Sequence, residues 1–273
     1  MITELDPLSP EEALLGVVIH PRALVSRQAR LGTGVRIGPG AVIGPEVELG
    51  DDVRVGPGAV VDGRTKVGKS TSIWSYATVG AEPQDLKYAG EKTDLIIGEG
   101  NQIREYVNIS IGTEGGGGQT VIGNNNLFMV YTHIAHDCHI GNDCIFANGI
   151  QIAGHVTIQD HVVFGGMSGG HQFCQFGEYS MVGAGAIVVQ DVPPFCMVQG
   201  DRAKINGLNV VGLRRAGIRG EKMSAVKQMF RLLYKDNLTV EEARERIEKE
   251  VPHMEQKTTF LAFLNRSERG ICR

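Results

Sequence analysis

An aliphatic residue recurs at every sixth position over much of the chain. The first run holds eleven aliphatic residues in strict phase: Ile19, Val25, Leu31, Ile37, Ile43, Leu49, Val55, Val61, Val67, Ile73 and Val79. The same phase returns at Ile97, Ile103 and Ile109. After a slip of one residue the period restarts at Ile122, Phe128, Ile134, Ile140, Phe146, Ile152, Ile158, Phe164, Gly170, Phe176, Val182 and Val188, where only Gly170 is not apolar.

A six-residue period is neither the 3.6 of an α-helix nor the 2 of a simple strand. It is typical of hexapeptide repeats, in which the chain turns after each short strand and three strands close a triangular coil of about 18 residues. The periodic residue fills the interior. The glycine that often follows it suits a corner, where a positive φ or close packing is needed. The repeat therefore predicts a mainly β protein built as a parallel β-helix, although the spacing does not indicate the hand of the coils.

Two interruptions of the period predict loops that project from the prism, near 81–94 and 111–120. Functional residues are often found where a regular scaffold is interrupted. The second loop contains the run Gly115–Gly118, which lacks the Gly-Lys-Ser/Thr ending of a phosphate-binding loop. We interpret that run as a flexible loop only.

The six-residue period ends near Val188, and helical patterns follow it. Three helices are expected, at 221–234, 240–251 and 254–264. Thr239 and Glu242 form a capping-box pattern before the second of them. The predicted organisation is a β-helix over 1–199 and a small α-helical C-terminal domain over 200–273.

Composition excludes several classes of protein. The net charge is −4 at pH 7, whereas nucleic-acid-binding domains are usually basic, so no nucleic acid is expected as a partner. The 5 cysteines form no Cys-x-x-Cys pair, which favours a reduced, cytoplasmic protein. The acidic segment Met1–Leu15 does not resemble a signal peptide, and no apolar run approaches the ~18 residues of a membrane span.

Histidines are concentrated along one edge of the predicted prism. Because one coil is about 18 residues, His136, Gly154–His155 and His171–Gln172 stack on one outward-facing edge. A neutral imidazole has a pKa near 6.5 and can accept a hydroxyl proton at neutral pH. Asp137 follows His136 directly. Adjacent residues of a strand point in opposite directions, so the sequence leaves open whether the carboxylate reaches the ring.

Other interpretations of the histidines remain possible. Three imidazoles and a water can form a catalytic zinc site, as in a γ-carbonic-anhydrase-like metalloenzyme. His133, His136 and His139 are spaced three apart, however, and their side chains do not readily converge on one ion. A non-catalytic structural β-helix is disfavoured by the two insertions. We expect no metal.

Several motifs give the chain a family resemblance. The run Thr132–Cys138 (THIAHDC) resembles the signature of the UDP-N-acetylglucosamine O-acyltransferases, which act first in lipid A synthesis. The runs 84–91, 153–155, 171–174 and 207–215 are also similar to that family. The similarity extends from about Val17 to the C-terminal helices, and these motifs are much more specific than the six-residue period.

The resemblance implies a left-handed β-helix, a homotrimer with sites between subunits, and an acyl carrier protein thioester as donor, with no cofactor. His136 resembles the general base that deprotonates the sugar 3-hydroxyl, which then attacks the thioester directly. Asp137 resembles the carboxylate that orients the base. The backbone N–H of Gly154 resembles the oxyanion donor.

Substrate-binding residues are implied in the same way. Asp85 and Lys87 resemble residues that hold the sugar of a UDP-amino sugar. Asn209 and Arg215 resemble the nucleotide-binding residues. Residues that resemble the lining of the groove are His133, His155, His171 and Gln172. An acidic carrier protein could dock on a basic surface formed by Arg202, Lys204, Arg214, Arg215 and Arg219.

Three positions depart from the family pattern. Val211 stands where relatives often carry an acidic residue, and Ala216 where they often carry a second Arg. Ala184 stands where a Gly leaves room for a long acyl chain, so we expect a somewhat shorter preferred chain. Two enzymatic alternatives stay open: a 3-amino sugar acceptor, which would give N-acylation, and a related hexapeptide acyltransferase that uses coenzyme A or acts one step later.

Overall fold

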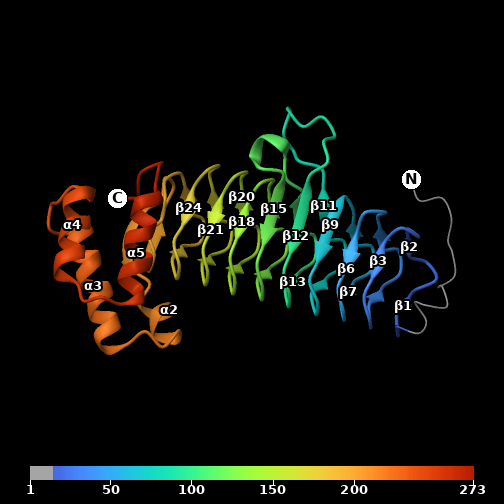
Figure 1. Cartoon of the computed structure of the whole chain (residues 1–273), viewed down its shortest axis with the longest axis horizontal. Helices are drawn as coiled ribbons and strands as arrows, with labels where there is room; N and C mark the ends of the chain where they lie inside the picture. The colour runs from blue at the N-terminus through green and yellow to red at the C-terminus, as the bar shows by residue number, and fades with distance from the viewer. Residues whose placement is uncertain (1–14) are drawn as a thin grey trace.

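A long triangular prism of coils leads to a bundle of helices at one end (Figure 1). This computed structural model describes residues 15–273. The expectation about the segment Met1–Leu15 therefore falls almost entirely outside the described residues. Within 15–273, no helix combines the length and the apolar character that crossing a membrane would require.

Three sheets form the faces of the prism, here called A, B and C, and strands that are hydrogen-bonded neighbours are usually three apart in the chain. Sheet A contains β1 (Val18–Ile19), β4 (Arg36–Ile37), β7 (Arg54–Val55), β10 (Ser72–Ile73), β13 (Gln102–Ile103), β16 (Leu127–Phe128), β19 (Ile145–Phe146), β22 (Val163–Phe164), β25 (Met181–Val182), β27 (Cys196–Gln199) and β28 (Lys204–Leu208). Sheet B contains β2 (Leu24–Val25), β5 (Val42–Ile43), β8 (Val60–Val61), β11 (Thr78–Ala81), β14 (Asn108–Ser110), β17 (His133–Ile134), β20 (Gln151–Ile152), β23 (Gly169–Gly170) and β26 (Ile187–Val188). Sheet C contains β3 (Arg30–Leu31), β6 (Glu48–Leu49), β9 (Arg64–Val67), β12 (Asp94–Ile97), β15 (Gln119–Ile122), β18 (His139–Ile140), β21 (Thr157–Ile158) and β24 (Gln175–Phe176).

The interior is filled by the residues of the six-residue period, as predicted. Phe128, Phe146 and Phe164 stack on successive strands of sheet A, with ring centroids 4.7 and 5.1 Å apart. Gly170 interrupts the apolar period because the Phe176 ring occupies the space, and a Cβ at Gly170 would lie 3.0 Å from Phe176 Cζ. The parallel β-helix is confirmed. At Gly170, the Phe176 ring of the next strand fills the space that an apolar side chain would otherwise occupy.

The glycines that follow the periodic residue serve close packing. A Cβ at Gly50 would lie 2.9 Å from the backbone nitrogen of Lys69 on the next coil, and Gly38 meets a similar contact with Pro57. Neither glycine has a positive φ. Of the two expected reasons for a glycine at this position, close packing applies at Gly38 and Gly50, whereas a positive φ applies at Gly80, with φ 85°. After Gly38 and Gly50, the left-handed residue stands two positions later, at Gly40 and Asp52.

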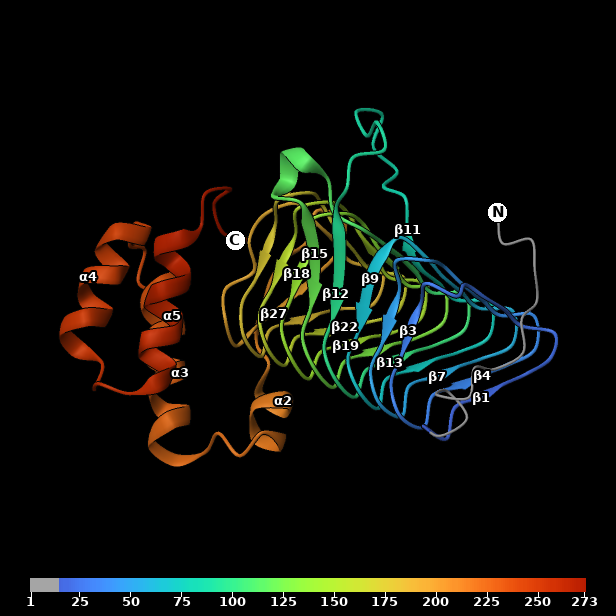
Figure 2. The same cartoon turned by 45° about the vertical axis from the view of Figure 1, so that its right-hand side comes forward.

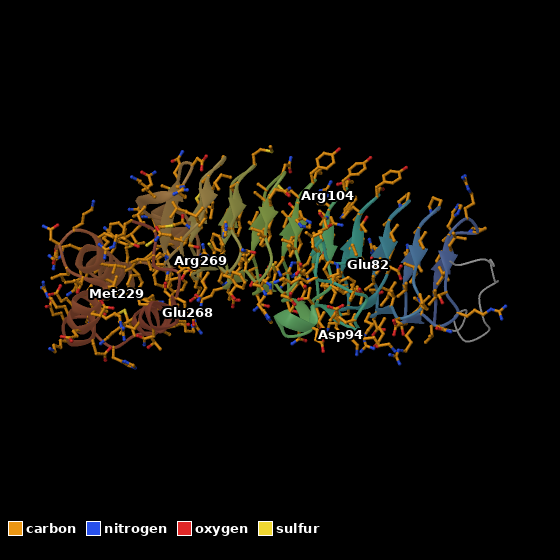
Figure 3. All side chains as sticks on the ribbon, turned by 90° about the horizontal axis from the view of Figure 1, so that it is seen from above. Glu82, Asp94, Arg104, Met229, Glu268 and Arg269 are labelled. Carbon is orange, nitrogen blue, oxygen red and sulfur yellow. The ribbon has the colours of Figure 1, made fainter. Side chains whose placement is uncertain are left out.

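Both insertions project from the same edge of the prism, between sheets B and C (Figures 1 and 2). The first follows β11, and the second follows β14 and includes the 3-10 helix η1 (Glu114–Gly116). Asp94, at the start of β12, holds the second loop at both ends: its N–H donates to the Gly118 carbonyl and its carbonyl accepts the Gly112 N–H. Figure 3 shows Asp94 beside this short helical turn.

The C-terminal segment contains α2 (Val210–Arg215), α3 (Gly220–Tyr234), α4 (Val240–Glu250) and α5 (Glu255–Arg266). The three predicted helices are confirmed to within two residues, as is the Thr239–Glu242 capping box of α4. The short helix α2 was not predicted. The buried faces of the helices form a second hydrophobic core around Met229, labelled in Figure 3.

Candidate active site

The predicted histidine edge lies at the corner between sheets B and C. His136 stands between β17 and β18, and His155 stands one coil further, between β20 and β21. The coils are joined through this corner by the His155 N–H, which donates to the His136 carbonyl at 3.1 Å. The stacking inferred from an 18-residue coil is therefore found in the structure.

His136 and Asp137 form a hydrogen-bonded pair. Asp137 Oδ2 lies 2.7 Å from His136 Nδ1, and the Asp137 side chain is fully buried. The contact exists because Asp137 has φ 59°, a left-handed corner conformation that turns its side chain toward its neighbour. Aspartate is among the few non-glycine residues that adopt this region readily. An ionised Asp137 accepts the Nδ1 proton, which leaves Nε2 unprotonated and able to accept another.

The second insertion encloses the Asp137 carboxylate. The Thr113 N–H donates to Oδ1 at 2.8 Å, and the Thr113 hydroxyl donates to Oδ2 at 2.6 Å. Thr120 Oγ1 accepts the Asp137 backbone N–H at 2.8 Å. A Cβ at Gly116 would lie 2.0 Å from Asp137 Cγ, so the glycine allows the loop to pack on the carboxyl group. The interpretation of the glycine run as a flexible loop only was therefore incomplete.

A cavity of about 520 Å³ opens beside this pair, at the end of sheet B. It brings together several predicted site residues, namely His133, His136, Gly154, His171 and Gln172. Apolar groups from Ile152, Ala153 and Ile187 share the lining. Gln84 also lines the cavity. Sequence reasoning noted Gln84 in its motif but did not assign it a site role.

His133 lies within the lining of this cavity. Burial lowers the pKa of its imidazole, and the neighbouring His136 adds a smaller lowering. Its Nδ1 lies 2.8 Å from Asn108 Oδ1 on the preceding coil. His133 is therefore held as a neutral group within the groove at neutral pH.

Gly154 packs directly against the candidate base. A Cβ at this position would lie 2.7 Å from His136 Cε1 and 2.9 Å from Nε2. Within residues 15–273, the Gly154 N–H has no hydrogen-bond acceptor. A backbone N–H donor beside the nitrogen that would accept the proton is the arrangement that an oxyanion site requires.

Other predicted residues lie outside the cavity lining. Asp85 Oδ1 accepts the Lys87 N–H at 3.0 Å, which forms a turn in the first insertion. His155 stacks on Phe173 with a centroid distance of 4.6 Å. His155 also meets His136 edge-on at 5.1 Å. His155 thus packs against His136 from the next coil.

Asn209, Arg215 and Ala184 lie at other corners of the chain. Asn209 caps α2 by accepting the Gly212 N–H, and its Nδ2 donates to the carbonyl of Tyr179, at the corner between sheets C and A. Arg215 is the last residue of α2 and is exposed. Ala184 is exposed at the corner between sheets A and B. A single chain does not bring these residues to the His136 cavity.

Among the described residues, one histidine–carboxylate group has metal-ligand spacing: atoms of His136, Asp137 and His155 lie within 4.8 Å of one another. Among the same residues, His133, His136 and His139 do not form such a group, in agreement with the expectation that their side chains do not converge on one ion. Asp137 already has a hydrogen bond to His136 and two from Thr113. An ion at this position would have to replace the His136–Asp137 hydrogen bond.

No nucleophilic cysteine is available at this corner in the described part of the chain. All five cysteines are free and buried. Burial raises the pKa of Cys138, the neighbour of Asp137, to about 12. Its thiol contacts the Ala153 carbonyl inside the prism. A thiol held in this way stays protonated at neutral pH and does not act as a nucleophile.

Comparison with known proteins agrees with this arrangement. A family model described as UDP N-acetylglucosamine O-acyltransferase, domain 2, matches residues 191–272, and a model described as bacterial transferase hexapeptide (six repeats) matches residues 119–149. The acyl-[acyl-carrier-protein]–UDP-N-acetylglucosamine O-acyltransferase of Myxococcus xanthus is 51% identical over 255 residues, which are 93% of this chain and 99% of the relative. The protein of that name from Xanthomonas euvesicatoria is 47% identical, over 94% of this chain and 98% of its own.

Solved structures give the same result. LpxA from Acinetobacter baumannii has a TM-score of 0.92 and 41% identity, and the match covers 94% of this chain and all of that one. LpxA from Bacteroides fragilis has a TM-score of 0.90 and 34% identity, with 94% and 100% coverage. The expected left-handed coil is confirmed by these neighbours.

Hexapeptide coils with a histidine–aspartate pair at an open corner, followed by a helical C-terminal part, define a hexapeptide-repeat acyltransferase. More specifically, the chain belongs to the family of the acyl-[acyl-carrier-protein]–UDP-N-acetylglucosamine O-acyltransferases.

Proposed function

We propose that this enzyme transfers an (R)-3-hydroxyacyl chain from acyl carrier protein to the 3-hydroxyl of UDP-N-acetylglucosamine, in lipid A biosynthesis. The observation that carries the proposal is the His136–Asp137 pair beside an open cavity, in a chain 51% identical to a relative that bears this name. The names of the relatives support the carrier protein and the sugar nucleotide as substrates, the family resemblance supports the 3-hydroxyacyl chain, and the geometry supports the catalytic roles.

The reaction proceeds by direct transfer. His136 Nε2 accepts the proton of the sugar 3-hydroxyl while its oxygen attacks the thioester carbonyl. The new C–O bond gives a tetrahedral oxyanion, which the Gly154 N–H stabilises. The C–S bond then breaks, and the thiol of the carrier receives the proton from His136. Asp137 orients the ring and stabilises its protonated form. The high pKa of Cys138 supports a route without a cysteine acyl-enzyme.

The remaining site residues bind and position the substrates. Asp85 and Lys87 hold the sugar. Among the groove residues, His133, His171 and Gln172 line the cavity, and His155 adjoins it by packing on His136. We propose that no metal or organic cofactor takes part. The hydrogen bonds that Asp137 already makes with His136 and Thr113 argue against a metal ion at that carboxylate.

We infer that the complete site forms between copies of the chain in a homotrimer. Asn209, Arg215 and Ala184 lie at corners away from His136, so their proposed roles in nucleotide and acyl-chain binding require a neighbouring subunit. Tyr76, Tyr106 and Tyr131 support association, because they stack along the corner between sheets A and B with 57%, 47% and 61% of their surface exposed. Contiguous exposed apolar surface of this kind marks interaction sites.

Acyl carrier protein is the proposed donor partner, and it is acidic. Basic side chains on β28, α2 and the segments beside them form a surface that complements this acidic partner. They belong to Arg202, Lys204, Arg214, Arg215 and Arg219. We also propose that 1–199 and 200–273 are separate domains. Two hydrophobic cores support this division, although Ala203 and Cys272 pack in the core of the prism and Phe195 packs in the core of the helices. The five buried free thiols support a cytoplasmic location.

The test is acyl transfer measured with each donor and each acceptor. We expect product from 3-hydroxyacyl carrier protein and UDP-N-acetylglucosamine, and none from the corresponding acyl-coenzyme A. Activity with coenzyme A alone would contradict the proposal. Activity with only a 3-amino sugar would change the acceptor to the amine.

Donors of different length test Ala184 in the same assay. The added methyl group relative to glycine predicts faster transfer of shorter chains, and Ala184→Gly should move the preference toward longer ones. Equal turnover of long and short donors by both enzymes would contradict this role.

A further inference from the structure

We propose that Thr113 is a positioning residue for acyl transfer, which fixes the Asp137 carboxylate and through it the imidazole of His136. This inference rests on the proposed role of His136 as the general base. Thr113 belongs to the second insertion and lies on a different coil from the pair that it contacts.

Thr113 binds both oxygens of Asp137. Its backbone N–H reaches Oδ1 at 2.8 Å, and its hydroxyl reaches Oδ2 at 2.6 Å. Oδ2 is also the atom that meets His136 Nδ1 at 2.7 Å. The carboxylate plane is therefore set by two donors from one residue, and this plane determines the direction in which the ring nitrogen is held.

The backbone at the corner does not provide this control by itself. Thr120 Oγ1 holds only the Asp137 N–H, so the carboxyl group remains free to rotate about its side-chain bonds unless Thr113 holds it. Thr113 is buried, as is Asp137, so water does not replace a lost donor readily. Charge-assisted hydrogen bonds in such surroundings are the strong ones.

The position of Thr113 is fixed from the side of the first insertion. The Thr93 hydroxyl donates to the Gly112 carbonyl at 2.6 Å, one residue before Thr113. Glu91, also in the first insertion, accepts the Ala89 N–H at 2.7 Å. Backbone N–H groups, first its own, then that of Ala89 and more weakly that of Glu114 next to Thr113, hold the pKa of the Glu91 carboxyl below its usual range. The first insertion, which also carries Asp85 and Lys87, thus holds Thr113 in place against Asp137.

The first test is Thr113→Val, which removes the hydroxyl donor but keeps the shape and the backbone N–H. We expect kcat to fall about tenfold, the order expected from one charged hydrogen bond, with KM values close to those of the wild type. Thr113→Ser keeps the donor and should retain most of the activity. Thr71→Val, which removes a buried hydroxyl bonded to the Gly98 carbonyl elsewhere in the prism, should leave kcat unchanged.

The pH profile separates positioning from simple structural damage. Without the Thr113 donor, the carboxylate is no longer held against the ring, so the protonated imidazole loses part of its stabilisation. The acid limb of kcat/KM should move to lower pH in Thr113→Val but not in Thr113→Ser or Thr71→Val. An NMR titration of the His136 ring should show the same displacement without turnover, so Thr113 can be tested independently of the substrates.

The double variant completes the test. In a His136→Ala background, Thr113→Val should cause no further loss of activity, because its effect acts through the ring. Equal losses in Thr113→Val and Thr113→Ser with an unchanged acid limb would reduce Thr113 to a structural residue and overturn the proposal. Full activity and an unchanged titration in Thr113→Val would also overturn it. If His136→Ala alone kept full activity, the base assignment would fail, whatever the titration showed.

Discussion

At the scale of single residues, the corner that carries His136 depends on left-handed backbone conformations. The residue types permit these conformations but do not predict them. Asp137 and His155 both have left-handed φ values, 59° and 61°. In an extended strand, Asp137 would point away from His136. The sequence predicted which coil positions stack, because an 18-residue coil fixes them. It left the His136–Asp137 contact open, since φ at residue 137 is determined by the turn.

The pKa of His133 provides a prediction about stability. Burial lowers its folded-state pKa, whereas the unfolded chain keeps a value near 6.5. The unfolded state therefore binds more protons as the pH falls below about 6.5, and the folded state loses stability until the folded-state pKa is reached. We expect the melting temperature to fall between pH 7 and pH 5, and to fall less in His133→Asn, which cannot titrate.

Thermal unfolding followed across this pH range checks the His133 prediction. His20→Asn is the matched control, because His20 is exposed near the first coil. The control should keep the wild-type pH dependence. An identical pH dependence in His133→Asn would show that another group is responsible.

At the scale of elements, the strands could be predicted well because one physical pattern generates all of them. The six-residue period placed the interior residue of nearly every strand. Sequence reasoning missed α2, whose six residues are too few to show a helical period. It also placed the second insertion correctly and misjudged its role, because the contact of Gly116 with Asp137 joins residues on different coils.

The second insertion yields a matched pair of variants. A Cβ at Gly116 would lie 2.0 Å from Asp137 Cγ, whereas a Cβ at Gly115 would meet no atom within 4 Å. Gly116→Ala should therefore displace the loop or the carboxylate and lower kcat by about tenfold or more, the order of one lost catalytic hydrogen bond. Gly115→Ala should leave kcat close to that of the wild type.

Steady-state kinetics on both variants, with circular dichroism to verify folding, provide the comparison. A folded Gly116→Ala enzyme with wild-type kcat would show that the packing of the loop on Asp137 has no catalytic consequence. Equal losses in the two variants would attribute the effect to the loop as a whole.

At the scale of the whole molecule, the three corners of the prism carry different chemistry. The corner between sheets B and C carries His136. The corner between C and A carries Tyr179, which binds Asn209, and the corner between A and B carries the tyrosine stack. The residue pattern offers no basis for bringing these corners together, and only the family resemblance implies association. One chain leaves the proposed nucleotide residues apart from the proposed base.

The tyrosine stack tests association. Tyr106 stacks between Tyr76 and Tyr131, with centroid distances of 5.5 and 5.2 Å. Tyr106→Glu should place a charge in the proposed interface between subunits. The mass in solution should then shift from that of three copies toward the 29.5 kDa of a single chain. Thr157→Glu, which adds the same charge on an exposed position of sheet C, should leave the wild-type mass.

Light scattering coupled to size-exclusion chromatography measures the mass directly. A Tyr106→Glu protein that kept the wild-type mass would remove the tyrosine stack from the proposed interface. A wild-type protein that was monomeric and fully active would contradict a site formed between copies.

The central claim is that His136, oriented by Asp137, is the base for acyl transfer. The most direct measurement is the rate of transfer from 3-hydroxyacyl carrier protein to UDP-N-acetylglucosamine by the wild type and by His136→Ala, with both proteins verified as folded. A general base contributes roughly 10²- to 10⁴-fold, so we predict an active wild type and a loss of that order in the variant. A folded His136→Ala enzyme with the wild-type rate would contradict the account and require another base.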